Sequence, residues 1–239
     1  MNNRTNSIAT SLEAKEGWTT SSDDALEGPP LTVDLARYRN PPWHTKGRGI
    51  LVRALWLYAN AVFCQNPLNT STRFTSALLR MFGAKIGRNC NIKPSVKFKS
   101  PWLIEVGDNT WIGEYAWLDS VSLIRIGANV CISQGVLLCA GGHDMTDPLF
   151  GMIEGPIIIE DGVWVGARAT ILPGAHLATH SIITAGSVFS GSTEPYGIYS
   201  GNPARLIRRR VLTDGGMAPE IAAEHKRTMD AFGLPTRRK

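Results

Sequence analysis

His143 is the side chain in this sequence best suited to acid–base chemistry. It lies in the segment Gly141-Gly142-His143-Asp144, where the two glycines allow a ligand to approach the backbone closely. A neutral imidazole, with an unperturbed pKa near ~6.5, can accept a proton at neutral pH. A histidine at the start of a polar loop is more often simply solvated, so the position alone does not decide its role.

Two carboxylates are candidates for orienting the His143 ring. A carboxylate bonded to one ring nitrogen directs the other nitrogen toward a reacting group. Asp119 lies one coil before His143 in the pattern described next, and Asp144 follows His143 directly. The sequence does not choose between them, because Asp144 could equally cap the following loop.

The elements that must position these residues follow a six-residue hydrophobic period. Apolar residues recur at Ile86, Ile92, Phe98, Val106, Ile112, Leu118, Ile126, Ile132, Leu138, Ile159, Val165, Ile171, Leu177, Ile183 and Phe189. A period of six is neither the helical period of 3.6 nor the strand period of two. It predicts short strands joined by corners, three to a coil, and therefore a parallel β-helix whose stacked coils share one core.

Two irregularities in this period carry further predictions. Glycine follows the apolar residue at Gly87, Gly107, Gly113, Gly127 and Gly166, and we expect these glycines at tight corners that other residues would strain. The pairs Ile104–Glu105 and Ile124–Arg125 lengthen two coils, and we expect them as inserts at one corner.

The period breaks once, at residues 144–158. A long insertion in a solenoid is usually a loop on the binding face. Asp147 and Phe150 in this segment are therefore candidates for contact with a substrate.

The remaining chain is divided into flanking segments. Residues 1–30 are polar and predict a disordered lead-in, residues 31–85 an arm and a helical cap, residues 86–191 the β-helix, and residues 192–239 a closing segment with a terminal helix over the last coil. Helices are expected at 49–63 and 71–82. The first is shorter than the ~20 residues that span a bilayer. It fits either a cap on the first coil or a helix lying on a membrane surface.

Composition limits the functional classes. Charged residues make up 19% and the net charge is +5, with much of the basic excess near the end of the chain. A nucleic-acid surface would spread basic and aromatic residues along one face, and this pattern is absent from the sequence. The four cysteines have no C-x-x-C spacing and suit packing better than metal binding. Without a signal-peptide pattern, the cytoplasm is the expected compartment. Residues 49–63 leave open a contact of the protein with the inner face of the membrane.

The segment around His143 and Thr146-Asp147-Pro148 resembles the catalytic segment of the maltose and galactoside O-acetyltransferases. It is more similar still to the colanic acid biosynthesis acetyltransferases, and that resemblance includes residues 79–87 and covers about residues 31–210. It implies a mainly β fold, the left-handed parallel β-helix of hexapeptide-repeat proteins, in a homotrimer with active sites between subunits. It also implies that His143 is the general base for an acceptor hydroxyl.

The same resemblance implies a binding site for acetyl-CoA. Gly166, Ala167 and Ala185 match small residues along the pantetheine arm, although the repeat favours small residues there anyway. Gly166 or Ala167 would also supply a backbone N–H for the oxyanion. Pro203, Arg205 and Arg208 match the segment beside the adenine and phosphates, where the arginine fork suits phosphate oxygens. Ser190 and Gly191 depart from the pattern, since relatives often have a basic residue there.

The sequence thus predicts an acetyl-CoA-dependent O-acetyltransferase that modifies a sugar hydroxyl during exopolysaccharide assembly, with a lipid-linked or nucleotide-linked glycan as acceptor and no metal. A non-catalytic β-helical scaffold or regulatory subunit is the alternative. A γ-type carbonic anhydrase is a further one, since His143, His176 and His180 could suggest zinc. It is disfavoured because His176 and His180 are four apart, whereas that family spaces its closest pair by five.

Overall fold

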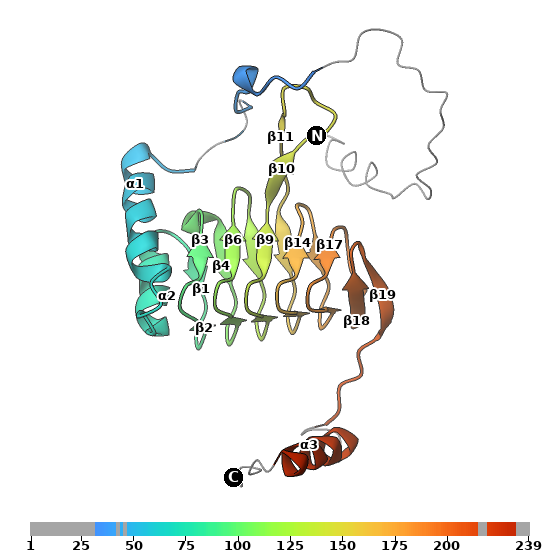
Figure 1. The fold of residues 1–239 in the computed structure, drawn as a ribbon. Helices are drawn as coiled ribbons and strands as arrows, with labels where there is room; N and C mark the ends of the chain where they lie inside the picture. The colour runs from blue at the N-terminus through green and yellow to red at the C-terminus, as the bar shows by residue number, and fades with distance from the viewer. Residues whose placement is uncertain (1–31, 42–43, 45–46, 215–218, 233–239) are drawn as a thin grey trace, which may run out of the picture. The chain divides into compact units, whose positions relative to one another are not determined.

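The six-residue period folds as a three-sided parallel solenoid (Figure 1). The computed structural model describes residues 32–41, 44, 47–214 and 219–232. The predicted lead-in at residues 1–30 lies outside the described residues. Residues 1–209 form one compact unit and residues 210–239 a second. The described part of the second unit is mainly helix α3 (Pro219–Ala231), so the expected helix exists, and its packing over the last coil stays a prediction.

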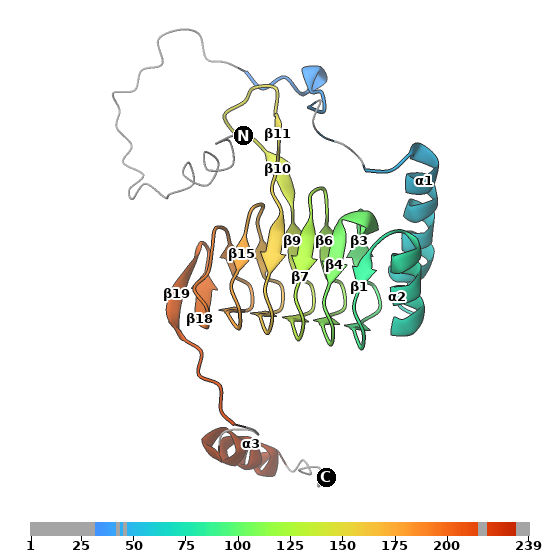
Figure 2. The same cartoon turned by 180° about the vertical axis from the view of Figure 1, so that it is seen from behind.

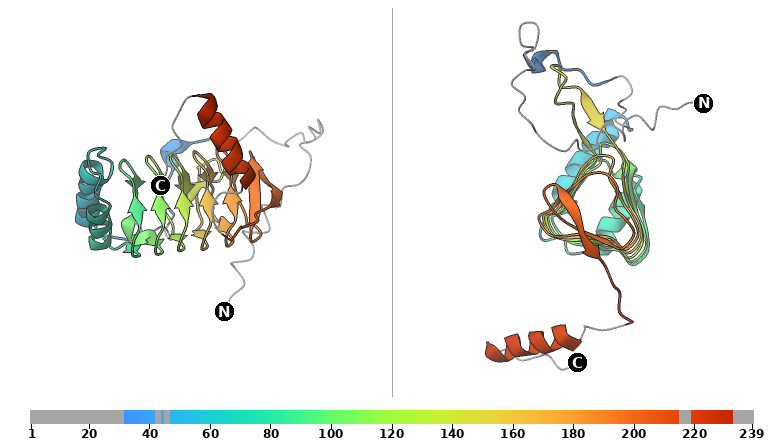
Figure 3. Two further views of the ribbon diagram at one scale, coloured as in Figure 1. Left: turned by 90° about the horizontal axis from the view of Figure 1, so that it is seen from below. Right: turned by 90° about the vertical axis from the view of Figure 1, so that its right-hand side faces the viewer.

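Each coil contributes one short strand to each of three sheets. The first sheet contains β1 (Lys85–Ile86), β4 (Ile104–Val106), β7 (Ile124–Ile126), β12 (Ile157–Ile159) and β15 (His176–Leu177). The second contains β2 (Asn91–Ile92), β5 (Trp111–Ile112), β8 (Cys131–Ile132), β13 (Trp164–Val165), β16 (Ile182–Ile183), β18 (Gly197–Gly201) and β19 (Ala204–Arg209). The third contains β3 (Lys97–Phe98), β6 (Trp117–Asp119), β9 (Leu137–Cys139), β14 (Thr170–Ile171) and β17 (Val188–Phe189). Seen end-on, the coils superimpose around one shared core (Figure 3).

The pairs predicted as corner inserts instead lengthen strands. Ile104 and Ile124 pair in register, and Ile157 pairs with Ile124 on the next coil. All three side chains are at most 1% exposed. The extra residues therefore add a second buried aliphatic column to the first sheet. Sequence spacing located the insertion correctly but placed it on the wrong part of the coil.

The glycines after the apolar residues allow successive coils to stack closely. They do not adopt a left-handed backbone conformation. None of these five has a positive φ, whereas Asn89, Asn109 and Asn129, at the true corners, have φ values of +54° to +59°. A Cβ on Gly107 would come within 2.5 Å of the Gly127 carbonyl carbon. Glycine is needed here because the next coil passes too close for a side chain.

We therefore expect Gly107→Ala to lower the free energy of unfolding by about 1–3 kcal/mol, the usual cost of overpacking. Urea unfolding followed by circular dichroism measures the change. Gly142→Ala is the matched control, since a Cβ there meets nothing within 4 Å. Equal stability of the two variants would contradict this explanation.

Two helices close one end of the solenoid (Figure 2). Helix α1 (Ile50–Ala59) continues as a π-helical turn (Asn60–Cys64), and α2 (Thr72–Met81) leads into β1. Trp56 on α1 is 2% exposed, and its indole donates to the carbonyl oxygens of Phe98 and Lys99 at 3.1 and 3.0 Å. Helix α1 thus packs on the first coil as a cap would. Within the described residues, no helix has the length and apolar character needed to cross a membrane.

Candidate active site

The segment predicted as a loop forms a hairpin that projects from the third coil (Figure 1). Strand β10 (Gly141–His143) pairs with the antiparallel strand β11 (Met152–Glu154), and His143 lies opposite Met152. A Cβ on Gly141 would overlap the Val121 side chain, so glycine lets the chain leave the solenoid here. The hairpin carries His143 away from the coil and exposes its ring.

The His143 ring is held by Phe150, across the turn of this hairpin. Its Nδ1 lies 2.9 Å from the Phe150 carbonyl oxygen, which can only accept a hydrogen bond, so Nδ1 carries the proton. The Phe150 ring stacks on the imidazole at 4.2 Å, and Tyr38 contacts it edge-on at 5.8 Å. In the neutral ring Nε2 is then the proton acceptor.

Asp147 stabilises the turn that contains the Phe150 carbonyl group. Its two carboxylate oxygens accept hydrogen bonds from the backbone N–H groups of Leu149 and Gly151, each at 2.9 Å. Phe150 lies between them with a φ of +58°, a conformation that a non-glycine residue adopts only when its surroundings enforce it. Asp147 and Phe150 therefore hold the His143 ring in place, a role that the sequence did not predict, and their contact with a substrate stays a prediction.

Neither carboxylate considered for orienting His143 is bonded to it. Asp119 pairs with Lys99, at 2.8 Å between Oδ1 and Nζ. Asp144 accepts from the backbone N–H and the hydroxyl of Thr146 at 2.8 and 2.6 Å. These bonds lower the pKa of the Asp144 carboxyl group. Asp144 thus stabilises the turn, and a backbone carbonyl takes the orienting position.

The N-terminal arm lies against the same hairpin, a contact that sequence reasoning missed. The backbone N–H of Asp34 donates to the Pro148 carbonyl at 2.8 Å. His44 Nδ1 lies 3.1 Å from a carboxylate oxygen of Glu154. Both contacts join segments that are more than 100 residues apart in the sequence. The arm is polar and has no hydrophobic period, so its sequence did not indicate either contact.

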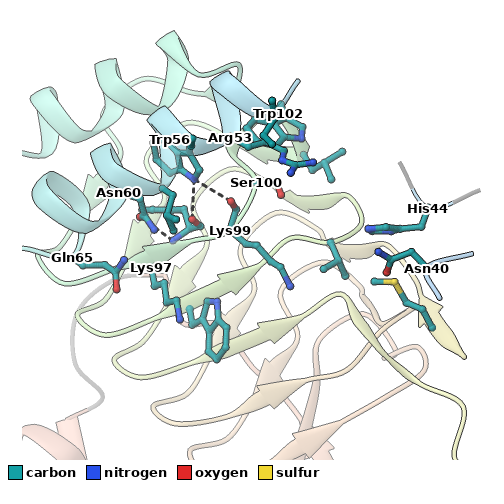
Figure 4. A pocket seen from close by; sticks show the side chains of 18 of the residues that line it. Asn40, His44, Arg53, Trp56, Asn60, Gln65, Lys97, Lys99, Ser100 and Trp102 are labelled. Carbon is teal, nitrogen blue, oxygen red and sulfur yellow. Dashed lines mark hydrogen bonds between the residues drawn. The ribbon is translucent and has the colours of Figure 1, made fainter. Parts of the chain in front are cut away.

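A cavity of about 670 Å³ opens between the arm, α1 and the first coil. Figure 4 shows it with residues from all three parts. His143 and Met152 of the hairpin line it, as do Arg53 of α1 and Lys97 and Lys99 of the first coil. A cavity that includes the candidate base is a suitable place for an acceptor.

The small residues expected to line a cofactor wall lie on adjacent coils. Gly166 follows β13, Ala185 follows β16, and an added Cβ on Gly166 would lie 2.5 Å from the backbone nitrogen of Ala185. The Gly166 N–H donates to the Ile183 carbonyl at 2.7 Å. This N–H group already bonds to the next coil, so it cannot also donate to an oxyanion. Ala167 is then the candidate for the backbone N–H donor.

The residues predicted to bind the phosphates lie on the β18–β19 hairpin, which is hydrogen-bonded to the coil of Ala185. Thr184, just before Ala185, bonds to the Ser200 hydroxyl at 2.8 Å, and Ser200 pairs across the β18–β19 hairpin with Arg205. Pro203 forms the turn of this hairpin, after a cis peptide bond. Arg205 and Arg208 are both exposed. These contacts link Gly166 and Ala185 to the hairpin that carries Pro203, Arg205 and Arg208, and we call this set the cofactor strip.

The histidines that suggested zinc have other partners. His176 Nε2 lies 2.7 Å from a Glu160 carboxylate oxygen, and His180 stacks on Tyr196 at 4.9 Å. Across the described ranges, no three His, Cys, Asp or Glu residues gather as a metal site would require.

The stacked six-residue coils define a class, the hexapeptide-repeat β-helix proteins. Residues 156–189 match the family described as "Hexapeptide repeat of succinyl-transferase". The colanic acid biosynthesis acetyltransferase WcaF of Escherichia coli K12 is 35% identical over 181 residues, which are 76% of this chain and 99% of WcaF. The chain therefore belongs to the hexapeptide-repeat acetyltransferases, and it is an enzyme of that family.

Two further relatives support this assignment. The galactoside O-acetyltransferase of Escherichia coli K12 is 30% identical over 135 residues, covering 55% of this chain and 66% of that protein. A solved galactoside acetyltransferase in complex with coenzyme A superimposes with a TM-score of 0.61 at 25% identity, over 70% of this chain and 88% of that one. The expected fold and family are confirmed.

Proposed function

We propose that this protein transfers an acetyl group from acetyl-CoA to a sugar hydroxyl, with His143 as the general base. The observation that carries the proposal is the hydrogen bond from His143 Nδ1 to the Phe150 carbonyl. It leaves Nε2 free to take the hydroxyl proton in the transition state. His143 also lines a cavity of about 670 Å³, which is large enough for a sugar.

The reaction then follows from proton transfer and acyl transfer. Nε2 accepts the hydroxyl proton while the hydroxyl oxygen attacks the thioester carbonyl carbon. The tetrahedral oxyanion is stabilised by a backbone N–H, for which Ala167 is the candidate. The carbon–sulfur bond then breaks, and the imidazolium returns its proton to the departing sulfur. The products are the acetyl ester and coenzyme A.

The acetyl-CoA site is proposed along Gly166, Ala167, Ala185 and the β18–β19 hairpin. The small side chains leave room for the pantetheine arm, and Arg205 and Arg208 offer exposed guanidinium groups for the phosphates. The solved relative that contains coenzyme A supports this choice of cofactor.

We expect the double variant Arg205→Gln/Arg208→Gln to weaken coenzyme A binding by about tenfold or more, since a charge-assisted hydrogen bond contributes about 1.5–3 kcal/mol. Isothermal titration calorimetry measures the affinity. Arg209→Gln is the control, because Arg209 already pairs with Glu194 at 2.8 Å. Equal affinities for all three proteins would remove these arginines from the site.

We further propose a homotrimer with active sites between subunits. Trp111 and Trp164 support it, since both project from one sheet of the solenoid and remain 58% and 45% exposed in the single chain. A neighbouring subunit would cover them and could bring its cofactor strip beside His143. A monomer in analytical ultracentrifugation would exclude this arrangement.

The proposed acceptor is a glycan of an exopolysaccharide like colanic acid, supported by the 35% identity to WcaF over nearly its whole length.

Contact with a membrane through α1 is part of the proposal. Ile50, Leu51, Leu55, Leu57 and Tyr58 are each at least 60% exposed. Failure of the protein to co-sediment with anionic lipid vesicles would exclude this contact.

The function is tested by incubating the purified protein with acetyl-CoA and candidate glycans. Mass spectrometry should detect glycans heavier by one acetyl group, together with free coenzyme A. A protein that binds coenzyme A but acetylates no glycan, while altering the activity of another transferase, would instead support the regulatory-subunit alternative.

A further inference from the structure

We infer that the cavity beside His143 takes an acceptor that carries a phosphate ester, and that Arg53 and Lys97, with Lys99, hold this phosphate. The inference rests on the proposed function, because it treats the cavity occupant as the acetyl acceptor. It extends that function by assigning a site and named residues to the phosphate of the acceptor.

The charge of the cavity lining is the first argument. Arg53, Lys97 and Lys99 line it, and none of its described lining residues is an aspartate or a glutamate. Figure 4 shows Lys97 and Lys99 extending from the first coil in the same direction. Three cations around one cavity favour an anionic occupant, and a neutral sugar would leave Arg53 and Lys97 without an anionic partner.

The partners of these cations are the second argument. Asp119 lies 2.8 Å from the Lys99 ammonium and is 15% exposed, so it fixes the direction of Lys99. The Lys97 ammonium lies 3.9 Å from the centre of the Trp117 ring, which positions it without neutralising it. Arg53 forms no ion pair with any carboxylate in the described chain. Two of the three cations therefore keep their full charge for a ligand.

The surroundings of the cations indicate two sources of such a phosphate. Ile50 and Leu57 of α1 also line the cavity and are 74% and 70% exposed. They would accommodate the lipid of a sugar linked to an isoprenoid phosphate. Trp102 and Trp117 lie in the same lining and could instead stack on the base of a nucleotide sugar. Both sources present a sugar whose phosphate lies beside it.

Inorganic pyrophosphate is the probe for the shared chemistry, and calorimetry measures its affinity. The variant Arg53→Gln/Lys97→Gln should bind pyrophosphate at least about tenfold more weakly than the wild type. The control Arg73→Gln/Lys93→Gln removes the same charge from exposed positions outside the cavity and should bind as the wild type does. Lys99 is kept, because its removal would leave Asp119 unpaired. Unchanged coenzyme A affinity verifies that each variant is folded.

Farnesyl diphosphate and uridine diphosphate then identify the source. Tighter binding of farnesyl diphosphate than pyrophosphate, lost in Leu57→Ser, supports a lipid-linked acceptor. Tighter binding of uridine diphosphate, unaffected by Leu57→Ser, supports a nucleotide sugar. Equal pyrophosphate affinity in the test and control variants, or no binding to the wild type, would overturn the inference. His143→Ala should keep its pyrophosphate affinity, so a failure of the base assignment is distinguishable from a failure of the phosphate site.

Discussion

His143→Ala should lower kcat for acetyl transfer by about 10²- to 10⁴-fold, the usual contribution of a general base. The imidazole donates a hydrogen bond from Nδ1 to the Phe150 carbonyl and keeps Nε2 as an acceptor, next to the cavity. Steady-state kinetics with acetyl-CoA and an acceptor that the wild type acetylates measures the change. The affinity for acetyl-CoA should not change, because the proposed cofactor residues lie on other coils.

His225→Ala is a suitable control for this substitution. His225 is exposed on α3 and should be dispensable for transfer. His143→Gln should be nearly as inactive as His143→Ala, since an amide can hydrogen-bond but cannot accept the proton. A His143→Ala enzyme with kcat within a few-fold of the wild type would contradict the base assignment.

Asp147→Ala should have the second-largest effect, a fall in kcat of about 10- to 100-fold. The carboxylate accepts the backbone N–H groups of Leu149 and Gly151, and losing hydrogen bonds to a charged group costs about 1.5–3 kcal/mol. The turn would then hold the Phe150 carbonyl less often in the position that orients His143. Because Asp147 acts through His143, the kinetic loss should appear in kcat, while coenzyme A affinity stays unchanged.

Two variants separate this positioning role from a general effect on the loop. Asp147→Asn keeps an acceptor oxygen for one of the two N–H groups and should recover part of the activity. Met145, at 92% exposure, makes no contact that the turn needs, so Met145→Ala should behave as the wild type. If Asp147→Ala raised KM and left kcat unchanged, Asp147 would be a substrate contact, as the sequence had suggested.

The periodic part of the chain was predictable because burial repeats in it. Every apolar residue of the six-residue period must face one core, so the pattern itself defines the strands and coils. His143 was found at the break in this period. The physical role of the glycines could not be predicted from the sequence, because a tight corner and a close approach between coils both favour a residue without a side chain. The folded backbone distinguishes them, through the φ angles and the 2.5 Å approach at Gly107.

The orientation of the candidate base could not be predicted. A carboxylate partner can be sought in a sequence, and Asp119 and Asp144 were reasonable choices. The actual partner is the backbone carbonyl of Phe150, and every residue has such a carbonyl, so residue types give no signal. The cavity was hidden for a similar reason. Arg53, Lys97 and Tyr38 come from a helix, a coil and an arm that only the tertiary fold brings together.

The most direct test of the account is the tautomer of His143, measured by ¹H–¹⁵N correlation of the full protein with labelled histidine. The chain has five histidines, and the His143→Gln variant assigns the signal. At a pH where the ring is neutral, Nδ1 should carry the proton and Nε2 should show the shift of an unprotonated nitrogen. A proton on Nε2 would contradict the proposed base, because the nitrogen facing the acceptor would then have no lone pair to receive the hydroxyl proton.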